Sequence, residues 1–469
     1  MGGIFGVARK GECTLDLFYG TDYLSHLGTK RGGMAVAGPL GINWKIHKLE
    51  SNYFRTQLEP DLPSLAGNIG IGAISDTDAQ PLPFTSHLGS FCIASVGRIA
   101  NSQELAAQAA GQRGCCFSGS SAGSLRPTEV IAVLLSAEKS FEDGIRAVQE
   151  KIRGSCSFLI MTSGGIYACR DKFGRTPLVI GRGEDGFAVS SESSAFQNLG
   201  YENQCDLGPG EAVFITPEGF ERRVEAGKEM QICTFLWVYY GYPSSTYEGV
   251  NVEAMRYRCG ARLAHNDEVD ADFVGGIPDS GIGHAVGYAN SKQLPYQRPI
   301  VKYTPTWPRS FMPQNQASRS LVARMKLIPN RALIDGKRIV FLDDSIVRGT
   351  QLKDNARILF ENGAAAAHMR IACPPLLHPC GFLNFSSSRN AFELIALKAV
   401  LALEGRADKN LELYTDAAAD RHAAMVDWIR RELKLSSLKF QSLDNLIKAV
   451  GLPAERICTH CWDGSGKGL

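Results

Sequence analysis

The sequence predicts two parts of different fold class: an N-terminal half built on antiparallel β-sheet and a C-terminal half built on a parallel α/β sheet. Through about residue 230, short apolar runs are separated by Gly- and Ser-rich turns, which is typical of antiparallel sheets. From about Gly249 onward, apolar strands alternate with helical segments, which is typical of parallel sheets. A length of 469 residues allows more than one domain.

In the N-terminal half, the expected strands are apolar runs bounded by turn residues. Examples are Gly67–Ile74, Gly89–Ile99, Cys156–Thr162, Gly165–Cys169, Pro177–Gly181 and Ala212–Ile215. Arg126–Glu138 and Phe141–Ile152 have helical spacing and are expected to cover the sheet.

In the C-terminal half, the spacing predicts helices over Val252–His265 and Gly281–Ser291, with a buried strand over Phe273–Pro278 between them. Lys337–Pro374 predicts a βαβ unit: strand Arg338–Leu342, helix Gln351–Asn362 and strand His368–Cys373. The remainder, Ala391–Val450, is predicted to be helical, with a polar interruption near Gly405–Asn410.

Composition excludes several classes of protein. Fifty basic and 48 acidic residues give a net charge of +2, so no global field favours nucleic acid or membrane. Apolar runs fall short of the ~18–20 residues of a transmembrane helix. The thirteen cysteines are scattered and odd in number, and no signal-peptide pattern precedes them, so we expect reduced thiols in a cytoplasmic protein.

The segment Ile339–Thr350, IVFLDDSIVRGT, carries the strongest chemical signal. An apolar strand runs into two carboxylates, Asp343 and Asp344, at the sheet edge where α/β proteins bind ligands. These oxygens suit ribose hydroxyls and Mg²⁺. Backbone N–H groups of Ser345–Thr350 can cradle a phosphate at the start of the next helix. The alternative is a surface turn before a capped helix.

This string resembles the PRPP signature of type I phosphoribosyltransferases, and the whole chain resembles the amidophosphoribosyltransferase family of iron–sulfur type. The similar segments in the C-terminal half are CTFLWVYYGYPSS at Cys233, PDSG at Pro278, RSFM at Arg309, HPC at His378 and CTHC at Cys458. Those in the N-terminal half are GGIFGVA at Gly2, Ala168–Arg182, SSES at Ser190 and LGPGE at Leu207.

The resemblance implies a fold and an assembly. Residues 2–230 would form an Ntn-hydrolase-like αββα sandwich, the class II glutamine amidotransferase fold. Residues 231–469 would form a type I phosphoribosyltransferase domain with a helical C-terminal tail and iron–sulfur cysteines. Family members assemble as homo-oligomers, so a dimer or tetramer is expected.

The resemblance also assigns roles by position. Ser280, Asp343 and Asp344 match the ligands of Mg²⁺–PRPP, and Lys326, Arg309 and Arg348 match cationic groups of the transferase site. The 5′-phosphate loop is matched by Ser345, Ile346, Val347, Arg348, Gly349 and Thr350. Tyr303–Phe311 takes the place of the loop that closes over PRPP, but here Pro308 replaces its glycine.

Four cysteines are candidates for a metal centre. Cys458 and Cys461 form a C-x-x-C pair, and Cys233 and Cys380 stand where the family places the other ligands of a [4Fe–4S] cluster. Spacing alone also fits a tetrahedral zinc site or four unliganded thiols.

The glutamine site departs from the family at four places. The family's N-terminal nucleophile is a cysteine whose own α-amine acts as base, and its position here is Gly2. The oxyanion-hole Asn-Gly is Val96-Gly97, the arginine for the glutamine carboxylate is Ser75, and the aspartate for the glutamine ammonium is Pro127. Four coordinated losses predict an inactive glutaminase.

Two hypotheses follow from these matches. The first is an enzyme that binds Mg²⁺–PRPP and transfers ammonia or another small amine, supplied from solution or by a separate protein. The second, favoured by Pro308 and by GFLNF at Gly381 in place of the family's Tyr-Gly-Ile-Asp, is a non-catalytic PRPP or nucleotide regulator, or a partner of an active paralogue.

Overall fold

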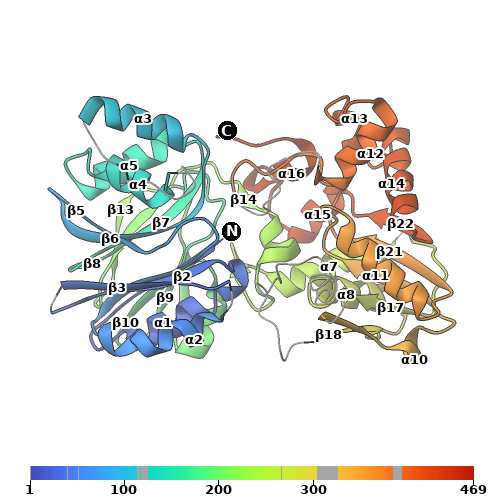
Figure 1. The fold of residues 1–469 in the computed structure, drawn as a ribbon, viewed down its shortest axis with the longest axis horizontal. Coiled ribbons are helices and arrows are strands. Elements are labelled where there is room, and N and C mark those ends of the chain that lie inside the picture. Colours follow the sequence, from blue (N-terminus) through green and yellow to red (C-terminus); the bar gives the residue numbers. More distant parts are fainter. Residues whose placement is uncertain are drawn as a thin grey trace.

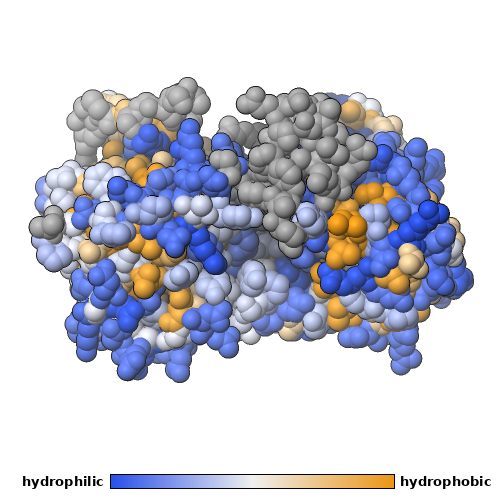
Figure 2. All heavy atoms as spheres, turned by 60° about the horizontal axis from the view of Figure 1, so that its bottom comes forward, coloured by the Kyte–Doolittle hydropathy of each residue, from blue (hydrophilic) through white to orange (hydrophobic). Residues whose placement is uncertain are grey.

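The structure is a computed structural model that describes residues 2–39, 41–50, 52–113, 117, 125–265, 267–303, 326–383 and 393–468. Figure 1 shows two halves side by side, the N-terminal half on the left and the C-terminal half on the right. Hydrophilic side chains cover much of the face in Figure 2, with separate hydrophobic areas between them. In the ranges described, every helix is too short or too polar to cross a bilayer.

Two antiparallel sheets build the N-terminal half. The seven-stranded sheet has the order β11-β9-β10-β1-β4-β2-β3, and the six-stranded sheet has the order β13-β12-β8-β7-β6-β5. The strands of the first are β1 (Gly2–Arg9), β2 (Arg31–Gly38), β3 (Gly41–Lys48), β4 (Ile69–Ser75), β9 (Val179–Arg182), β10 (Gly186–Ser190) and β11 (Glu202–Asp206). Those of the second are β5 (Leu82–Ser86), β6 (Gly89–Ile99), β7 (Gly154–Thr162), β8 (Gly165–Cys169), β12 (Ala212–Ile215) and β13 (Phe220–Val224).

Helices cover the outer face of each sheet, as Figure 1 shows. The helices are α1 (Thr14–Asp22), α2 (Phe54–Leu58) and the short α6 (Phe196–Leu199) on the seven-stranded side, and α3 (Ser102–Arg113), α4 (Pro127–Leu135) and α5 (Phe141–Lys151) on the other. Strand β6 illustrates why both faces of a sheet are covered. Cys92 and Ala94 pack between the sheets, whereas Phe91 and Ile93 pack under the helices. This alternation buries both faces of the sheet, and the predicted αββα sandwich is confirmed.

The C-terminal half contains a four-stranded parallel sheet in the order β17-β20-β21-β22. Its strands are β17 (Phe273–Gly276), β20 (Arg338–Asp343), β21 (Ala366–Ile371) and β22 (Ser437–Phe440). Helices α7 (Val252–His265), α8 (Ile282–Lys292) and α11 (Thr350–Glu361) lie within two residues of their predicted bounds. The antiparallel pair β18 (Ile300–Lys302) and β19 (Leu327–Pro329) flanks residues 304–325.

The prediction of a helical segment over Ala391–Val450 was wrong at one place. From residue 393 onward, where the structure describes this segment, it contains four helices, namely α12 (Ile395–Glu404), α13 (Glu412–Thr415), α14 (Asp420–Glu432) and α15 (Leu443–Val450). Between the last two, Ser437–Phe440 forms β22, the edge strand of the parallel sheet. A strand of four residues between two helices is too short to show a period of its own, and pairing with β21 decides its conformation.

Short elements join the two halves. They are β14 (Ile232–Cys233), a π-helix over Leu236–Tyr240, β15 (Thr246–Tyr247), β16 (Val250–Asn251), β23 (Ile457–Cys458) and α16 (His460–Asp463). The short helix α10 (Arg331–Ile334) lies within the C-terminal half, between β19 and β20. Strand β14 pairs in parallel with β23 near the C-terminus. The tail then reaches the N-terminal half, where the N–H of Gly154 donates to the carbonyl of Gly468 at 2.9 Å. Both halves therefore meet around Cys233.

Candidate functional site

The phosphate loop lies between the end of β20 and the start of α11. Asp343 closes the strand and Thr350 begins the helix, as the βαβ prediction requires. The Ser280 hydroxyl, from the turn before α8, donates to Oδ1 of Asp343 at 2.9 Å. The backbone N–H of Asp344 donates to the same oxygen at 2.9 Å, and the Ser345 hydroxyl donates to Asp344. The structure thus brings Ser280, Asp343 and Asp344 together.

These two carboxyl groups are adjacent, and Asp344 is buried whereas Asp343 is half-buried. Burial, and next the neighbouring Asp344 carboxylate, raises the pKa of Asp343 well above its ordinary value. Burial also raises the pKa of Asp344, against the hydroxyl of Ser345 and the charge of Arg256. Two adjacent like charges with little access to water need a proton or a cation to offset them. The donor set is all oxygen, so these residues fit Mg²⁺, and Ser280, Asp343 and Asp344 would hold it.

Gly349 is the loop position at which a residue with a side chain would be strained. Its φ of +79° lies in the left-handed region, and a Cβ there would be 2.4 Å from Cδ1 of Ile395. The N–H of Ile395 donates to the carbonyl of Val347 at 2.8 Å, so the start of α12 is hydrogen-bonded to the loop. Ile346 is buried and anchors the same loop.

Replacing Gly349 with alanine is expected to destabilise the fold by about 1–2 kcal/mol and to weaken PRPP binding, because the left-handed backbone and Ile395 both oppose a side chain. Gly336→Ala is the matched control: its φ is +70°, but no atom lies within 4 Å of the added Cβ. Thermal unfolding and PRPP calorimetry check this. Equal PRPP affinity for Gly349→Ala and Gly336→Ala would contradict a phosphate role for the loop.

The cationic candidates are less fully placed. The Arg348 guanidinium donates to Glu393 at 2.5 Å, and both side chains are partly exposed. Lys326 immediately precedes β19, and its carbonyl accepts a hydrogen bond from the N–H of Tyr303 at 2.9 Å. Arg309 and Pro308 lie outside the described residues, as does the rest of 304–325.

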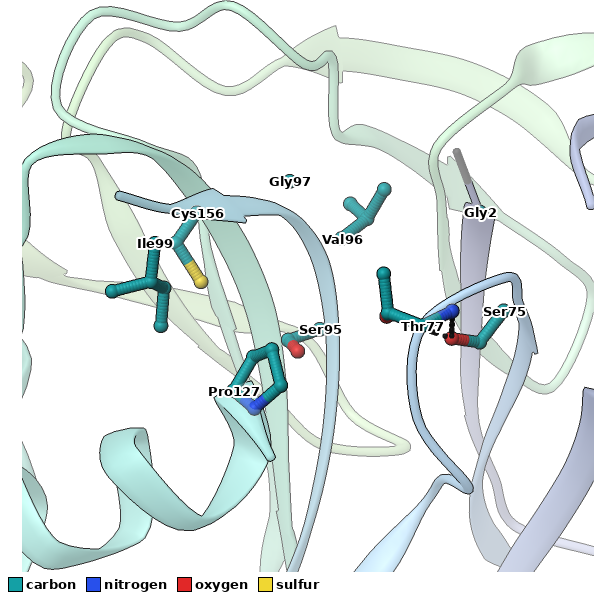
Figure 3. Close-up of a pocket in the computed structure, with 9 residues that line it drawn as sticks. All are labelled: Gly2, Ser75, Thr77, Ser95, Val96, Gly97, Ile99, Pro127 and Cys156. Atoms are coloured by element: carbon teal, nitrogen blue, oxygen red, sulfur yellow. Dashed lines mark hydrogen bonds between the residues drawn. The ribbon is translucent and has the colours of Figure 1, made fainter. Parts of the chain in front are cut away.

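The four altered positions of the glutamine site meet at one small cavity of about 10 Å³ (Figure 3). It is lined by Gly2, Ser75, Thr77, Ser95, Val96, Gly97, Ile99, Pro127 and Cys156. Such a volume holds about one water molecule. Positions far apart in the sequence were assigned to one site by resemblance alone, and the structure brings them together.

Strand pairing leaves no room for a side chain at the nucleophile position. Gly2 lies opposite Ser75 in the β1–β4 ladder, and a Cβ on Gly2 would be 2.5 Å from the carbonyl oxygen of Ile74. The Ser75 hydroxyl accepts from the N–H of Thr77 at 3.2 Å, the bond drawn in Figure 3. Pro127 begins α4 and offers neither charge nor donor.

Sequence reasoning missed Cys156, which points into this cavity in Figure 3. It faces Gly97 across the β6–β7 ladder, so the signal that could have found it was strand register. Burial raises the pKa of the Cys156 thiol, which keeps it neutral and a poor nucleophile.

The four candidate metal cysteines gather where the two halves meet. Cys233 and Cys458 are partners in the β14–β23 ladder. A hydrogen bond from the Cys461 thiol lowers the pKa of Cys380 to about 6, against burial. Burial raises the pKa of Cys233, and the nearby Cys458 and Cys380 raise it further. Four thiols from three segments are therefore neighbours.

Within the described ranges, no three of these or other His, Cys, Asp or Glu side chains are arranged around a single ion. A cluster holds each thiolate on a different iron, so its ligands stand farther apart than those of one zinc ion. The cysteines fit a cluster by donor type and number.

Comparison with known proteins agrees with the fold. A family model described as a glutamine amidotransferase domain matches residues 69–198. The amidophosphoribosyltransferase of Mycobacterium tuberculosis (strain H37Rv) is 32% identical over 477 residues, which cover 98% of this chain and 85% of the relative. That of Bacillus subtilis (strain 168) is 32% identical over 461 residues, with 96% and 89% covered.

Solved structures are similar over the full length. Glutamine PRPP amidotransferase from B. subtilis, in complex with ADP and GMP, superposes with a TM-score of 0.86 at 30% identity, covering 100% of this chain and 97% of that one. A structure titled as the allosteric regulatory enzyme of purine biosynthesis has a TM-score of 0.85 at 30% identity, with 100% and 96% covered. The chain belongs to the amidophosphoribosyltransferase family.

Proposed function

We propose that this protein binds Mg²⁺–PRPP and transfers its phosphoribosyl group to ammonia or another small amine, and that it no longer hydrolyses glutamine. The observation that carries the proposal is the cavity of about 10 Å³ at the glutamine site. Gly2 stands there at the position of the family's N-terminal cysteine and Val96 at that of its oxyanion-hole asparagine. Ser75 and Pro127 stand at the positions of the groups for the substrate's charged ends. The phosphate loop, by contrast, keeps its carboxylates, its left-handed glycine and its helix N-terminus.

The chemistry is displacement at the anomeric carbon of ribose. The amine nitrogen forms a bond to that carbon, the bond to the pyrophosphate oxygen breaks, and the amine loses a proton. Asp343 and Asp344 would orient the ribose hydroxyls, and the N–H groups of Ser345–Thr350 would hold the 5′-phosphate. Bound Mg²⁺ supplies positive charge to the leaving pyrophosphate. Lys326, Arg309 and Arg348 are proposed to add to that charge.

Cys233, Cys380, Cys458 and Cys461 are proposed to hold a [4Fe–4S] cluster with a structural role. The support is that the β14–β23 pair and the Cys380 segment converge from parts of the chain that are otherwise remote. We also propose a boundary between the two domains at residues 230 and 231, a homo-oligomer, and a cytoplasmic location in keeping with unpaired thiols.

The test is PRPP consumption by anaerobically purified protein with Mg²⁺ and, in separate reactions, glutamine, ammonium or a panel of small amines. Turnover with ammonium or an amine but not with glutamine is expected. PRPP binding by calorimetry without any turnover would overturn the transferase and favour the non-catalytic regulator. Absence of binding would overturn both.

Restoring the cysteine alone is not expected to restore the glutaminase. In Gly2→Cys, the new Cβ conflicts with the carbonyl of Ile74, and the family's other three glutamine-site residues are still replaced by Ser75, Val96 and Pro127. Glutamate release from glutamine should stay at background, while ammonium-dependent turnover should be unchanged. Release of glutamate by Gly2→Cys above the rate without enzyme would show that the site is intact apart from its nucleophile.

A further inference from the structure

A buried arginine from the N-terminal half lies against the four cysteines. Arg175 follows β8 and has no exposed surface. Its backbone carbonyl accepts from the N–H of Cys233 at 3.1 Å. Its guanidinium lies 3.7 Å from the ring centre of Phe382, two residues after Cys380, and 5.0 Å from that of Phe173. Arg175 thus touches two of the three cysteine segments.

The guanidinium uses only part of its donor capacity. Nη2 donates to the Gln231 side chain at 3.1 Å and to the carbonyl of Lys467. Nε and Nη1 are buried and have no hydrogen-bond partner within the portion of the chain that the structure describes. The carboxylate of Asp171 nearby accepts instead from the backbone N–H groups of Phe173 and Thr176. Buried donors without an acceptor are unfavourable, which suggests that one is missing.

The third cysteine segment supplies a group of the right kind. Cys458 is the partner of Cys233 in the β14–β23 ladder, and the N–H of Cys233 donates to the carbonyl of Arg175, so Cys458 also lies beside Arg175. A thiolate ligand carries negative charge and accepts hydrogen bonds from N–H donors, which a neutral thiol does weakly.

We infer that Arg175 is a positioning residue for the iron–sulfur cluster: its free N–H groups donate to the Cys458 sulfur, and its charge raises the reduction potential of the cluster. The inference rests on the proposed cluster. Reduction adds one electron to an already anionic group, and a buried cation favours that more negative state. Because Arg175 belongs to the N-terminal half, that half contributes to the electronic properties of a centre whose ligands all lie in the other.

The experiment compares Arg175→Gln, Arg175→Lys and the wild-type chain, each purified anaerobically with its iron and sulfide measured first. Redox titration followed by electron paramagnetic resonance should show Arg175→Gln with about a tenfold lower reduced-to-oxidised ratio at a fixed potential, which corresponds to about 59 mV. Arg175→Lys keeps the charge and should shift less. The rate at which dioxygen bleaches the absorbance near 400 nm is the second readout, and it should rise in both variants.

Arg98→Gln is the matched control. Arg98 also comes from the N-terminal half and donates to the carbonyl of Cys380 at 3.1 Å, but its side chain is exposed. Loss of the Arg98 guanidinium weakens the contact between the N-terminal half and the Cys380 segment. It should leave the reduction potential of the cluster near the wild-type value. An equal shift in Arg98→Gln, or unchanged potential and bleaching in both Arg175 variants, would overturn the inference and leave the cluster intact. Wild-type protein without iron and sulfide would instead overturn the cluster itself. Should Arg175→Gln fail to fold, Arg175→Lys decides by the same two readouts.

Discussion

Replacing Asp344 with asparagine is expected to lower kcat/KM for PRPP by about 10²–10³-fold, a loss of roughly 3–4 kcal/mol of transition-state stabilisation. The change keeps the size of the side chain but removes a charge that the ribose and Mg²⁺ require. The apo protein should be as stable as the wild type or more so, because burial raises the pKa of both Asp343 and Asp344. A buried pair of like charges opposes folding, and asparagine relieves it.

Steady-state kinetics and thermal unfolding of the same preparation check this prediction. Asp354→Asn, an exposed acid on α11 that pairs with Arg357, is the control and should behave as the wild type. Loss of activity together with a lower melting temperature would mean that Asp344 stabilises the fold. Undiminished kcat/KM would remove it from the transferase site.

Replacing Cys461 with alanine is expected to abolish the cluster and to lower the melting temperature by roughly 5–15 °C. The cluster would tie together Cys233, Cys380 and the tail, which are far apart in sequence, so its loss compares with that of a native covalent cross-link, about 2–5 kcal/mol. The tail beyond Cys461 should then become sensitive to protease, since its contacts with the N-terminal half depend on the same anchor.

Iron analysis, the absorbance near 400 nm and limited proteolysis measure these effects. Cys205→Ala is the control, because Cys205 is an exposed thiol on β11. Stoichiometric zinc in place of iron in the wild-type protein would assign the site to zinc. Full iron content in Cys461→Ala would exclude this cysteine as a ligand.

Much of the fold followed from local patterns. The six strands expected in the N-terminal half lie within two residues of their predicted ends, because each has both a buried core face and clear turn residues at its limits. The βαβ unit around β20 and α11 was predicted equally well from its sequence. β22 was not, since four residues carry no detectable period and their pairing with β21 comes from distant sequence.

The candidate site was only partly accessible from the sequence. The sequence identifies Asp343 and Asp344 because they lie at the end of an apolar strand and before a helix. No local pattern identifies Cys156 or Arg175. The register of the sheet brings Cys156 to the glutamine-site cavity, and the packing of the two halves brings Arg175 to the four cysteines. Arg309 and its neighbours, which would close over the substrate, remain predictions.

The parallel pairing of β14 with β23 has a consequence for biogenesis. The Thr234 hydroxyl donates to the carbonyl of Cys458 across 224 residues of sequence. At about 5–20 residues per second, a ribosome makes the second partner roughly 10–45 s after the first. During that interval all strands of the N-terminal sandwich have been synthesised, yet Cys233 has no strand to pair with. Iron delivery would therefore be productive late in synthesis or after it, and the maturation of this protein would depend on the supply of iron and sulfide at that moment.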